Sequence, residues 1–286
     1  MFTHGAKSAG MPGLGAIFAV MLSAGMASGV QAAPFIIDDF SLPADGTHIT
    51  QACPAAFTTG MCAGVSSTSA VTNYTDPGST GAIWGNIRNT NLHSVVGTTN
   101  TPSTVVVSSS GAGTLGFANA DGNRSTMVLE YNGMAGFQGN GSSALAAVNF
   151  LAFGDTFNIR IQSLDLTISA RIQLWDSDGT MVRHDFSKPG TSAGQTFPFE
   201  HYVNLGFGAG EFVNFGGGNN LFDFTDVVAV NVTAFGIPQG TGAGQGVDMS
   251  LDLIQITNIP EPTTVALLGI GLAGLGVVRR NRRAAA

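Results

Sequence analysis

Acidic side chains recur in close pairs along the chain, and such pairs could serve two kinds of chemistry. The pairs are Asp38 with Asp39, Asp176 with Asp178, Asp223 with Asp226, and Asp248 with Asp252. Two carboxyl groups at a suitable separation provide the acid and the nucleophile or base of glycoside hydrolysis, whereas clustered carboxylates are also calcium ligands. Most such pairs in an acidic protein lie in turns or on solvated faces. We therefore expect no catalytic centre, and a glycoside hydrolase is the alternative.

Two short motifs have the letters of active sites but lie in an unsuitable context. Residues 190–194 spell the G-x-S-x-G pattern, whose serine requires a turn between a strand and a helix. Pro189 precedes this motif and Pro198 follows it closely, so no helix can continue from it. Residues 269–274 spell G-x-G-x-x-G inside an apolar run that no strand precedes. The five histidines show no metal-ligand spacing, so we expect them at the surface.

The two cysteines of the chain, Cys53 and Cys62, lie close together in sequence. The residues between them include Pro54 and Gly60, a loop composition that can bring two sulfur atoms together. In an oxidising compartment such cysteines pair, which predicts a disulfide. A metal site is not expected, because His48 is the only nearby histidine and no Cys-x-x-Cys occurs.

The element that would position several of these residues is clearest at 164–174. Apolar and polar residues alternate strictly there, which predicts a half-buried strand. Residues 175–180 supply a turn with a glycine, and 181–186 return as the second strand of a hairpin. The alternation changes phase near Ser163, which predicts a turn or a bulge. Trp175 falls on the polar face, where its indole could stack on a sugar ring or lie beneath a neighbouring loop.

Further alternating runs at 228–234 and 249–253, joined by glycine-rich connections, extend the same pattern. They predict an all-β body over 33–259, an antiparallel β-sandwich of jelly-roll type. One segment, 142–151, could instead form a short helix.

Composition and charge exclude several classes of protein. The 286 residues are 44% hydrophobic and 10% charged, which is too apolar for a disordered chain. Of the 11 basic residues, four lie among the last eight positions, so no basic patch remains for nucleic acid. Residues 33–259 carry six basic and 17 acidic residues, a net charge of −11. This charge favours solubility and cation binding over contact with anionic polymers.

The first 32 residues have the layout of a secretory signal peptide. Lys7 lies in a weakly basic start, an apolar core covers 14–22, and small residues follow. We expect cleavage after Ala32. The apolar core is shorter than the roughly 20 residues that span a bilayer, so we do not expect an uncleaved anchor.

The last 27 residues contain three parts in a fixed order: a Pro-Glu-Pro triplet, an uncharged run and an arginine cluster. They are Pro260, Glu261 and Pro262, then 263–278, then Arg279, Arg280, Arg282 and Arg283. At about 1.5 Å per residue the run reaches roughly 24 Å, slightly short of a hydrocarbon core of about 30 Å. A transmembrane helix can still span if the bilayer thins. The arginines then predict type I topology, with the tail in the cytoplasm and 33–259 outside.

These three parts together resemble the PEP-CTERM sorting signal of Gram-negative bacteria that make exopolysaccharide. The resemblance covers 260–286, with Ile259 at a position where many such tails have valine. It implies an exosortase, a membrane-embedded transpeptidase-like enzyme that recognises the triplet, removes the helix, and releases or attaches the body at the cell surface. The alternative is an ordinary C-terminal anchor that happens to follow Pro-Glu-Pro.

The two ends of the body resemble the first and last strands of galactose-binding-like carbohydrate modules. These segments are 35–40 (FIIDDF) and 248–253 (DMSLDL). The resemblance implies that the terminal strands are neighbours. A structural calcium ion could then lie between Asp38 or Asp39 and Asp248 or Asp252, and no other cofactor is expected.

The resulting hypothesis is an exported, non-enzymatic protein of the cell surface or extracellular matrix. Its role would be structural or polysaccharide-binding, in exopolysaccharide or biofilm. Its expected partners are an exosortase, the inner membrane transiently, and exopolysaccharide.

Overall fold

The computed structural model describes residues 32–40, 48–51, 65–70, 83–97, 103–107, 113–119, 123–191, 197–215, 221–235 and 247–259. The chain divides into two units, Met1–Ala32 and Ala33–Ala286, and all the described strands belong to the second. The predicted signal peptide up to residue 31, Cys53, Cys62 and the segment from 260 onward lie outside the described residues. No helix within the described ranges is long and apolar enough to cross a bilayer.

The described part is all-β, with antiparallel strands in two sheets and two short 3-10 turns, η1 (Trp84–Asn86) and η2 (Phe150–Ala152). Sheet 1 has the order β11 (Phe199–Asn204), β8 (Thr156–Leu164), β14 (Val247–Thr257), β6 (Leu115–Asn119), β5 (Ser103–Val107) and β2 (His48–Gln51). Its seventh strand, β1 (Phe35–Asp38), pairs with the C-terminal half of β14, on the edge that β6 occupies farther along. The first and last strands of the body are therefore neighbours, as predicted.

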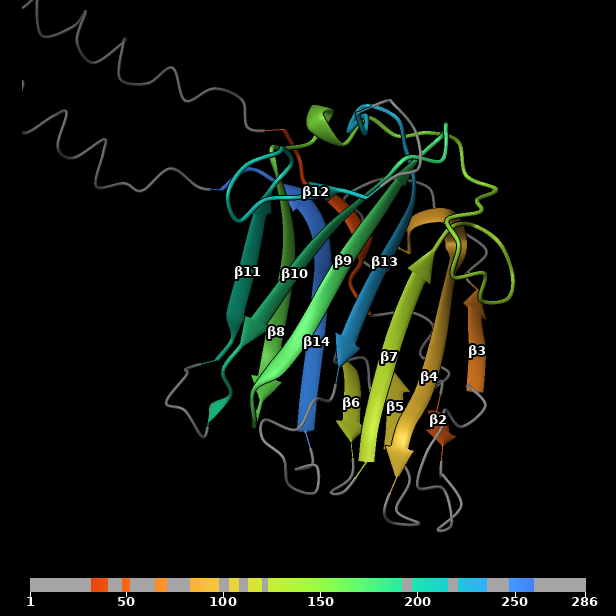
Figure 1. The fold of residues 1–286 in the computed structure, drawn as a ribbon, viewed down its shortest axis with the longest axis vertical. Coiled ribbons are helices and arrows are strands. Elements are labelled where there is room, and N and C mark those ends of the chain that lie inside the picture. The colour runs from red at the N-terminus through yellow and green to blue at the C-terminus, as the bar shows by residue number, and fades with distance from the viewer. Residues whose placement is uncertain are drawn as a thin grey trace, which may run out of the picture. The chain divides into compact units, whose positions relative to one another are not determined.

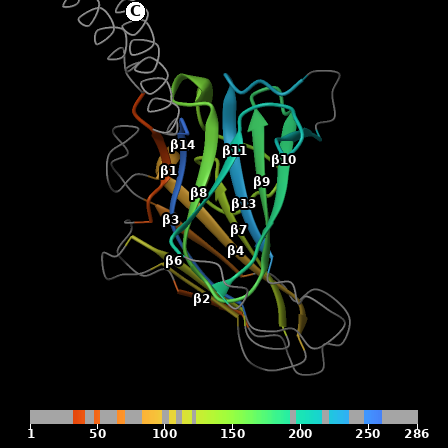
Figure 2. The same cartoon turned by 90° about the vertical axis from the view of Figure 1, so that its left-hand side faces the viewer.

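Sheet 2 lies in front of sheet 1 in Figure 1, and Figure 2 turns the same fold by 90°. Its order is β12 (Val213–Asn214), β10 (Met181–Lys188), β9 (Ile168–Asp176), β13 (Val227–Phe235), β7 (Asn123–Tyr131), β4 (Ile87–Gly97) and β3 (Val65–Ala70). The predicted hairpin is confirmed, because β9 and β10 pair over their whole length around the turn at 177–180.

Both sheets contribute their inward residues to one hydrophobic core, which gives the sandwich-like layering. From sheet 1 come Phe117, Phe157 and Leu251, and from sheet 2 come Leu129, Ile172 and Val232, each at most 2% exposed. Fully burying such a side chain contributes about 1.5–3 kcal/mol.

An aromatic cluster closes the core beside β1. The ring of Phe35 lies 5.9 Å from that of Trp84 and 5.6 Å from that of Phe150, measured between centroids. Edge-on and tilted packing of this kind adds to the burial energy.

The prediction of one strand over 164–174 is wrong at its start. Leu164 ends β8 in sheet 1, and β9 begins only at Ile168 in sheet 2. The apolar alternation runs through the intervening turn because Leu166 packs against the same core that both strands cover. The phase change near Ser163 falls within β8, where Ser163 pairs with Ser250 but Ile161 pairs with the next residue, Leu251, so the predicted irregularity is confirmed.

The prediction of a helix over 142–151 is also wrong. Only η2 is helical there, and residues 132–149 form an irregular loop, called the 132–149 loop below. Side chains bind backbone groups along it: Asn132 Nδ2 donates to the Ser142 carbonyl at 3.0 Å, and Ser143 Oγ donates to the Val228 carbonyl at 2.7 Å. Such side-chain to backbone bonds compete with a helical hydrogen-bond pattern.

Candidate ligand-binding face

The outer face of sheet 2 carries polar side chains aligned across neighbouring strands. The register places Arg183 opposite Gln173 and Asp185 opposite Arg171 on β10 and β9. Their neighbours along β9, Ile172 and Leu174, point into the core and are 0% exposed. Because side chains of a strand alternate between faces, burial of the apolar set fixes the polar set on the outside.

At the centre of this face one carboxylate holds two arginines. Arg171 Nε donates to Asp185 Oδ1 at 2.7 Å. Arg183 forms an ion pair with the other oxygen, with 2.9 Å between its Nε and Asp185 Oδ2. The side chains of Arg171, Arg183 and Asp185 are 31%, 27% and 46% exposed. These three residues are called the Asp185 cluster below.

Aromatic rings support both arginines of the Asp185 cluster. The Arg171 guanidinium lies over the Phe235 ring at 5.4 Å from its centroid, and the Arg183 guanidinium lies over the Phe215 ring at 3.8 Å. A guanidinium stacked on an aromatic face gains a favourable cation–π interaction. Each arginine is therefore held by an ion pair at Nε and by a ring at its face.

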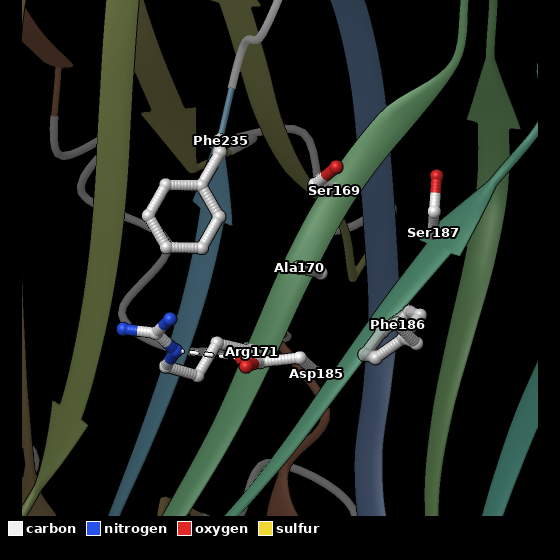
Figure 3. Close-up of a pocket in the computed structure, with 7 residues that line it drawn as sticks. All are labelled: Ser169, Ala170, Arg171, Asp185, Phe186, Ser187 and Phe235. Carbon is white, nitrogen blue, oxygen red and sulfur yellow. Dashed lines mark hydrogen bonds and ion pairs between the residues drawn. The ribbon is translucent and has the colours of Figure 1, made fainter. Parts of the chain in front are cut away.

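A hollow of about 490 Å³ lies beside the Asp185 cluster, and Figure 3 shows its lining. Phe235, Arg171 and the hydroxyl residues Ser169 and Ser187 surround it. Ser187 Oγ donates to the Ile168 carbonyl at 3.1 Å. The hollow therefore combines an aromatic ring, a guanidinium and two hydroxyl groups on rigid strands.

At the other end of β9, near the β9–β10 turn, the 132–149 loop covers the outer face of sheet 2. Glu130 on β7, 1% exposed, anchors it: its carboxylate accepts hydrogen bonds at 2.8 Å from the backbone N–H groups of Gln138 and Gly139. Asn89 on β4 donates to the Met134 carbonyl at 2.8 Å. These buried groups hold the loop in place and are not open to a ligand.

Trp175 lies under this loop, which favours the second of the two predicted roles for its indole. It has the outward parity of Arg171 and Gln173 but is only 7% exposed, packed with Val228 and Ala229. A Cβ added to Gly141 would approach Trp175 Cδ1 to 2.2 Å, so only glycine fits above the ring. The loop therefore covers the indole in this structure, and stacking of Trp175 on a sugar ring stays a prediction.

The Asp38 side chain points into the core, where its carboxylate accepts hydrogen bonds from other buried side chains. Its Oδ2 accepts hydrogen bonds from Arg88 Nη1 at 2.6 Å and from the Tyr131 hydroxyl at 2.9 Å, and all three side chains are 0% exposed. Its Oδ1 accepts from the Phe40 N–H at 2.8 Å, and Phe40 has a positive φ of 55°. Burial raises the pKa of Asp38, against the opposing effect of the Arg88 charge.

Asp248, another calcium candidate, lies far from Asp38. Asp38 pairs with Ile254 on β14, six residues beyond Asp248, which is about 20 Å at 3.4 Å per residue. The Asp248 N–H donates to Asp165 Oδ1 at 2.8 Å, and burial together with the Asp165 charge raises the pKa of Asp248. Asp39, half-buried, follows Asp38 at the end of β1.

Asp252 binds a basic side chain on the outer face of sheet 1. Arg160 Nε lies 2.8 Å from both of its carboxylate oxygens, and Gln162 donates to Oδ2. Within the described ranges, no three His, Cys, Asp or Glu side chains form a group that could hold a metal ion. The structure thus brings the terminal strands together but not the four carboxylates, and the calcium site stays a prediction.

The carboxylates of Asp176 and Asp223, near the β9–β10 turn, accept hydrogen bonds from backbone N–H groups. Asp176 accepts from the N–H groups of Thr180 at 2.8 Å and Asp223 at 3.1 Å, and Asp223 accepts from Thr225 N–H at 2.8 Å. Burial, with Asp178 as a second cause, raises the pKa of Asp176 to about 6. These contacts with backbone N–H groups are those of turn residues.

Two histidines that we expected at the surface meet where β10 and β11 approach each other. His184, 8% exposed, donates from Nδ1 to the Glu211 carbonyl at 3.1 Å, which leaves its Nε2 to accept from His201 Nε2 at 3.1 Å. Burial, helped by the charges of Lys188 and His184, lowers the pKa of His201 to about 3. The pair joins the edges of the two sheets, and the expectation of surface histidines is wrong for His184.

Sequence reasoning did not single out the Asp185 cluster. The usable signal was the hairpin itself, because pairing 168–176 with 181–188 around a four-residue turn places Asp185 opposite Arg171. Phe215 and Phe235 come from other segments, and alternation along one strand could not place them there.

Several solved structures of low sequence identity are similar to parts of this chain. An agarase is 11% identical with a TM-score of 0.34, covering 52% of this chain and 21% of the agarase. An exo-beta-agarase is 10% identical with a TM-score of 0.35, covering 82% of this chain and 25% of its own. The chain thus spans between about a fifth and a quarter of the agarase chains that it matches.

A Family 11 carbohydrate-binding module from Clostridium thermocellum, solved with a beta-1,3-1,4-mixed-linked tetrasaccharide, is 7% identical with a TM-score of 0.33. The match covers 80% of this chain and 99% of the module. No curated protein matches this chain.

At the C-terminus, residues 258–283 match the PEP-CTERM protein-sorting motif. The match contains the predicted triplet at 260–262 and the arginines at 279–283, so this part of the sequence analysis is confirmed. The chain therefore carries a PEP-CTERM sorting motif, which indicates export and membrane-associated sorting toward the cell surface.

Proposed function

We propose that this chain is a cell-surface or matrix protein of a Gram-negative bacterium whose body binds polysaccharide without hydrolysing it. Its C-terminal segment passes through the inner membrane with the body outside, and an exosortase processes it at the Pro-Glu-Pro triplet. The observation that carries the binding role is the Asp185 cluster beside an open hollow lined by Phe235, Ser169 and Ser187.

The chemistry of this face suits a sugar chain. Sugars present rows of hydroxyl groups and apolar ring faces, which need both hydrogen-bonding groups and aromatic carbon. Arg171, Ser169 and Gln173 offer the polar groups from one strand, and Phe235 and Phe215, the latter 49% exposed, offer rings. Groups on paired strands are preorganised, which lowers the entropy that binding loses.

The carboxylates of this face support binding over hydrolysis. A glycosidase needs one carboxyl group as acid and a second as nucleophile or base, both facing the sugar. Both oxygens of Glu130 accept backbone N–H groups beneath the 132–149 loop, and both oxygens of Asp185 are paired with arginines. Each carboxylate thus already has a positioning role.

The test is to titrate the exported protein with a panel of polysaccharides by affinity electrophoresis and calorimetry, and to measure released reducing ends in parallel. Replacing Phe235→Ala should weaken binding of the best glycan at least tenfold, about 1.4 kcal/mol. Phe207→Ala is the matched control, because Phe207 is 47% exposed and does not line the hollow. Enzyme-dependent release of reducing ends, or equal binding by the Phe235→Ala protein, would contradict the proposal.

A further inference from the structure

We propose that the polysaccharide bound at this face is acidic, and that the terminal nitrogens of Arg171 and Arg183 bind its anionic groups. This inference rests on the proposed function and names the chemical class of its ligand. The Asp185 cluster carries it, because its three charges are arranged so that the positive groups face outward.

The geometry leaves the binding ends of both arginines open. Each guanidinium approaches Asp185 through Nε, and the terminal nitrogens of Arg171 and Arg183 make no hydrogen bond within the part of the chain that the structure describes. Figure 3 shows the two terminal nitrogens of Arg171 on the side of its guanidinium away from Asp185. A guanidinium donates two parallel hydrogen bonds to a carboxylate or sulfate through such an edge, and these charge-assisted bonds are the stronger kind.

Asp185 acts here as a positioning residue. One carboxylate fixes two side chains that would otherwise be flexible, while Phe235 and Phe215 support their faces. Since two guanidinium groups share one carboxylate, the cluster keeps one net positive charge. Preorganised arginines of this kind lose less conformational freedom on binding than free ones.

The distribution of charge makes this face unlike the rest of the body. The body carries six basic residues, of which two belong to the Asp185 cluster. Arg88 is buried in the core, Arg160 is paired with Asp252 on sheet 1, and Lys188, which follows Ser187 of the hollow, has its Nζ over the Phe199 ring. The nearest acidic turn along β9 starts at Asp176, five residues from Arg171, or about 16 Å at 3.3 Å per residue. That distance exceeds the Debye length of about 8 Å at physiological salt.

The net charge of −11 therefore does not decide the charge of the ligand. It favours cations on average over the body, as the sequence indicated, but screening confines each charge to its own neighbourhood. Among the residues that line the hollow, only Arg171 and Asp185 are charged. The Asp185 cluster therefore supplies the charge at the hollow itself.

The experiment compares one sugar backbone with and without its charge. Polygalacturonate should bind the exported protein at least tenfold more tightly than its fully methyl-esterified form, in which each carboxylate is neutral. Dextran sulfate and dextran form a second matched pair, which tells whether sulfate serves in place of carboxylate. Binding of the charged member of either pair should weaken as sodium chloride rises from 50 to 500 mM.

Variants test whether Arg171 and Arg183 are responsible for the tighter binding of the charged glycan. Arg171→Gln with Arg183→Gln should lower the affinity for the charged glycan at least tenfold, and either single variant should lower it measurably. Arg160→Gln, which removes one positive charge from the other sheet as each single variant does from this one, should change the affinity less than twofold. Melting temperatures confirm that all variants fold. Asp185→Asn should not strengthen binding, although it removes a negative charge, because it releases both arginines.

Two outcomes separate this inference from the function on which it rests. Equal binding of charged and neutral partners in both pairs, or a double variant that binds like the native protein, would overturn the acidic ligand and leave polysaccharide binding in place. Failure to bind every polysaccharide would overturn both. A tighter complex with Asp185→Asn would overturn the positioning role of Asp185.

Discussion

Replacing Asp38→Asn should destabilise the protein more than any surface charge change. Asp38 on β1 of sheet 1 binds Arg88 and Tyr131 from sheet 2, and all three are 0% exposed. Removing the charge leaves Arg88 buried without its carboxylate, which costs about 3–5 kcal/mol. For a body of this size each kcal/mol lowers Tm by about 2–4 °C, so we expect a fall of roughly 6–20 °C.

Thermal and urea unfolding followed by circular dichroism measures this loss. The control is Asp185→Asn, which breaks an exposed ion pair worth about 0–1 kcal/mol. A second control replaces both partners, Asp38→Leu with Arg88→Met, and should be more stable than the single variant because no buried charge is left unpaired. A loss below about 1 kcal/mol for Asp38→Asn would refute the reasoning that this ion pair joins the two sheets.

Three further outcomes are expected. Gly141→Ala should lower stability by about 1–3 kcal/mol and shift Trp175 fluorescence to the red. Gly136→Ala is its control, because Gly136 also has a positive φ but a Cβ there would meet no atom within 4 Å; equal losses would disprove the contact with Trp175. Asp176 is a carboxyl whose folded pKa is raised to about 6 from 3.8, so its contribution to stability is complete below about pH 4 and is lost as the pH rises to about 6. Asp176→Asn should remove that part of the pH dependence of the urea midpoint, and an unchanged profile would contradict the assignment. Mass spectrometry of unreduced peptides should find Cys53 joined to Cys62, and two free thiols would count against both the disulfide and the oxidising compartment.

Much of the fold follows from alternation along the chain. The β9–β10 hairpin and strand β13 were predictable because one face of each is apolar throughout. The passage from β8 to β9 was not, since Leu164, Leu166 and Ile168 alternate continuously although they belong to two different sheets and the turn between them. A hydrophobic pattern with a period of two residues indicates that one face of a segment is buried against a core. It does not indicate which of the two sheets the segment belongs to.

The candidate site was less predictable than the fold. Trp175 had the parity of an exposed residue, but the 132–149 loop covers it, and that contact depends on Glu130 and Gly141 from distant sequence. Asp38 was predicted as a calcium ligand from its neighbours in sequence, whereas its carboxylate accepts a hydrogen bond from Arg88, fifty positions away. Contacts between residues far apart in sequence determine whether a polar side chain is buried, paired or accessible to a ligand. The hydrophobic pattern of a single strand carries no information about these contacts.

The most direct test of the account follows the C-terminal segment in the native cell. Fractionation with surface labelling, followed by mass spectrometry of the C-terminal peptide, should find the body outside the cell and cleaved at or near 260–262. Replacing Arg279, Arg280, Arg282 and Arg283 with Gln should impair both cleavage and surface delivery, because the positive cluster sets the orientation of the tail. A native protein that remains in the cytoplasm, or a variant that is cleaved and delivered like the native one, would contradict the sorting on which the account depends.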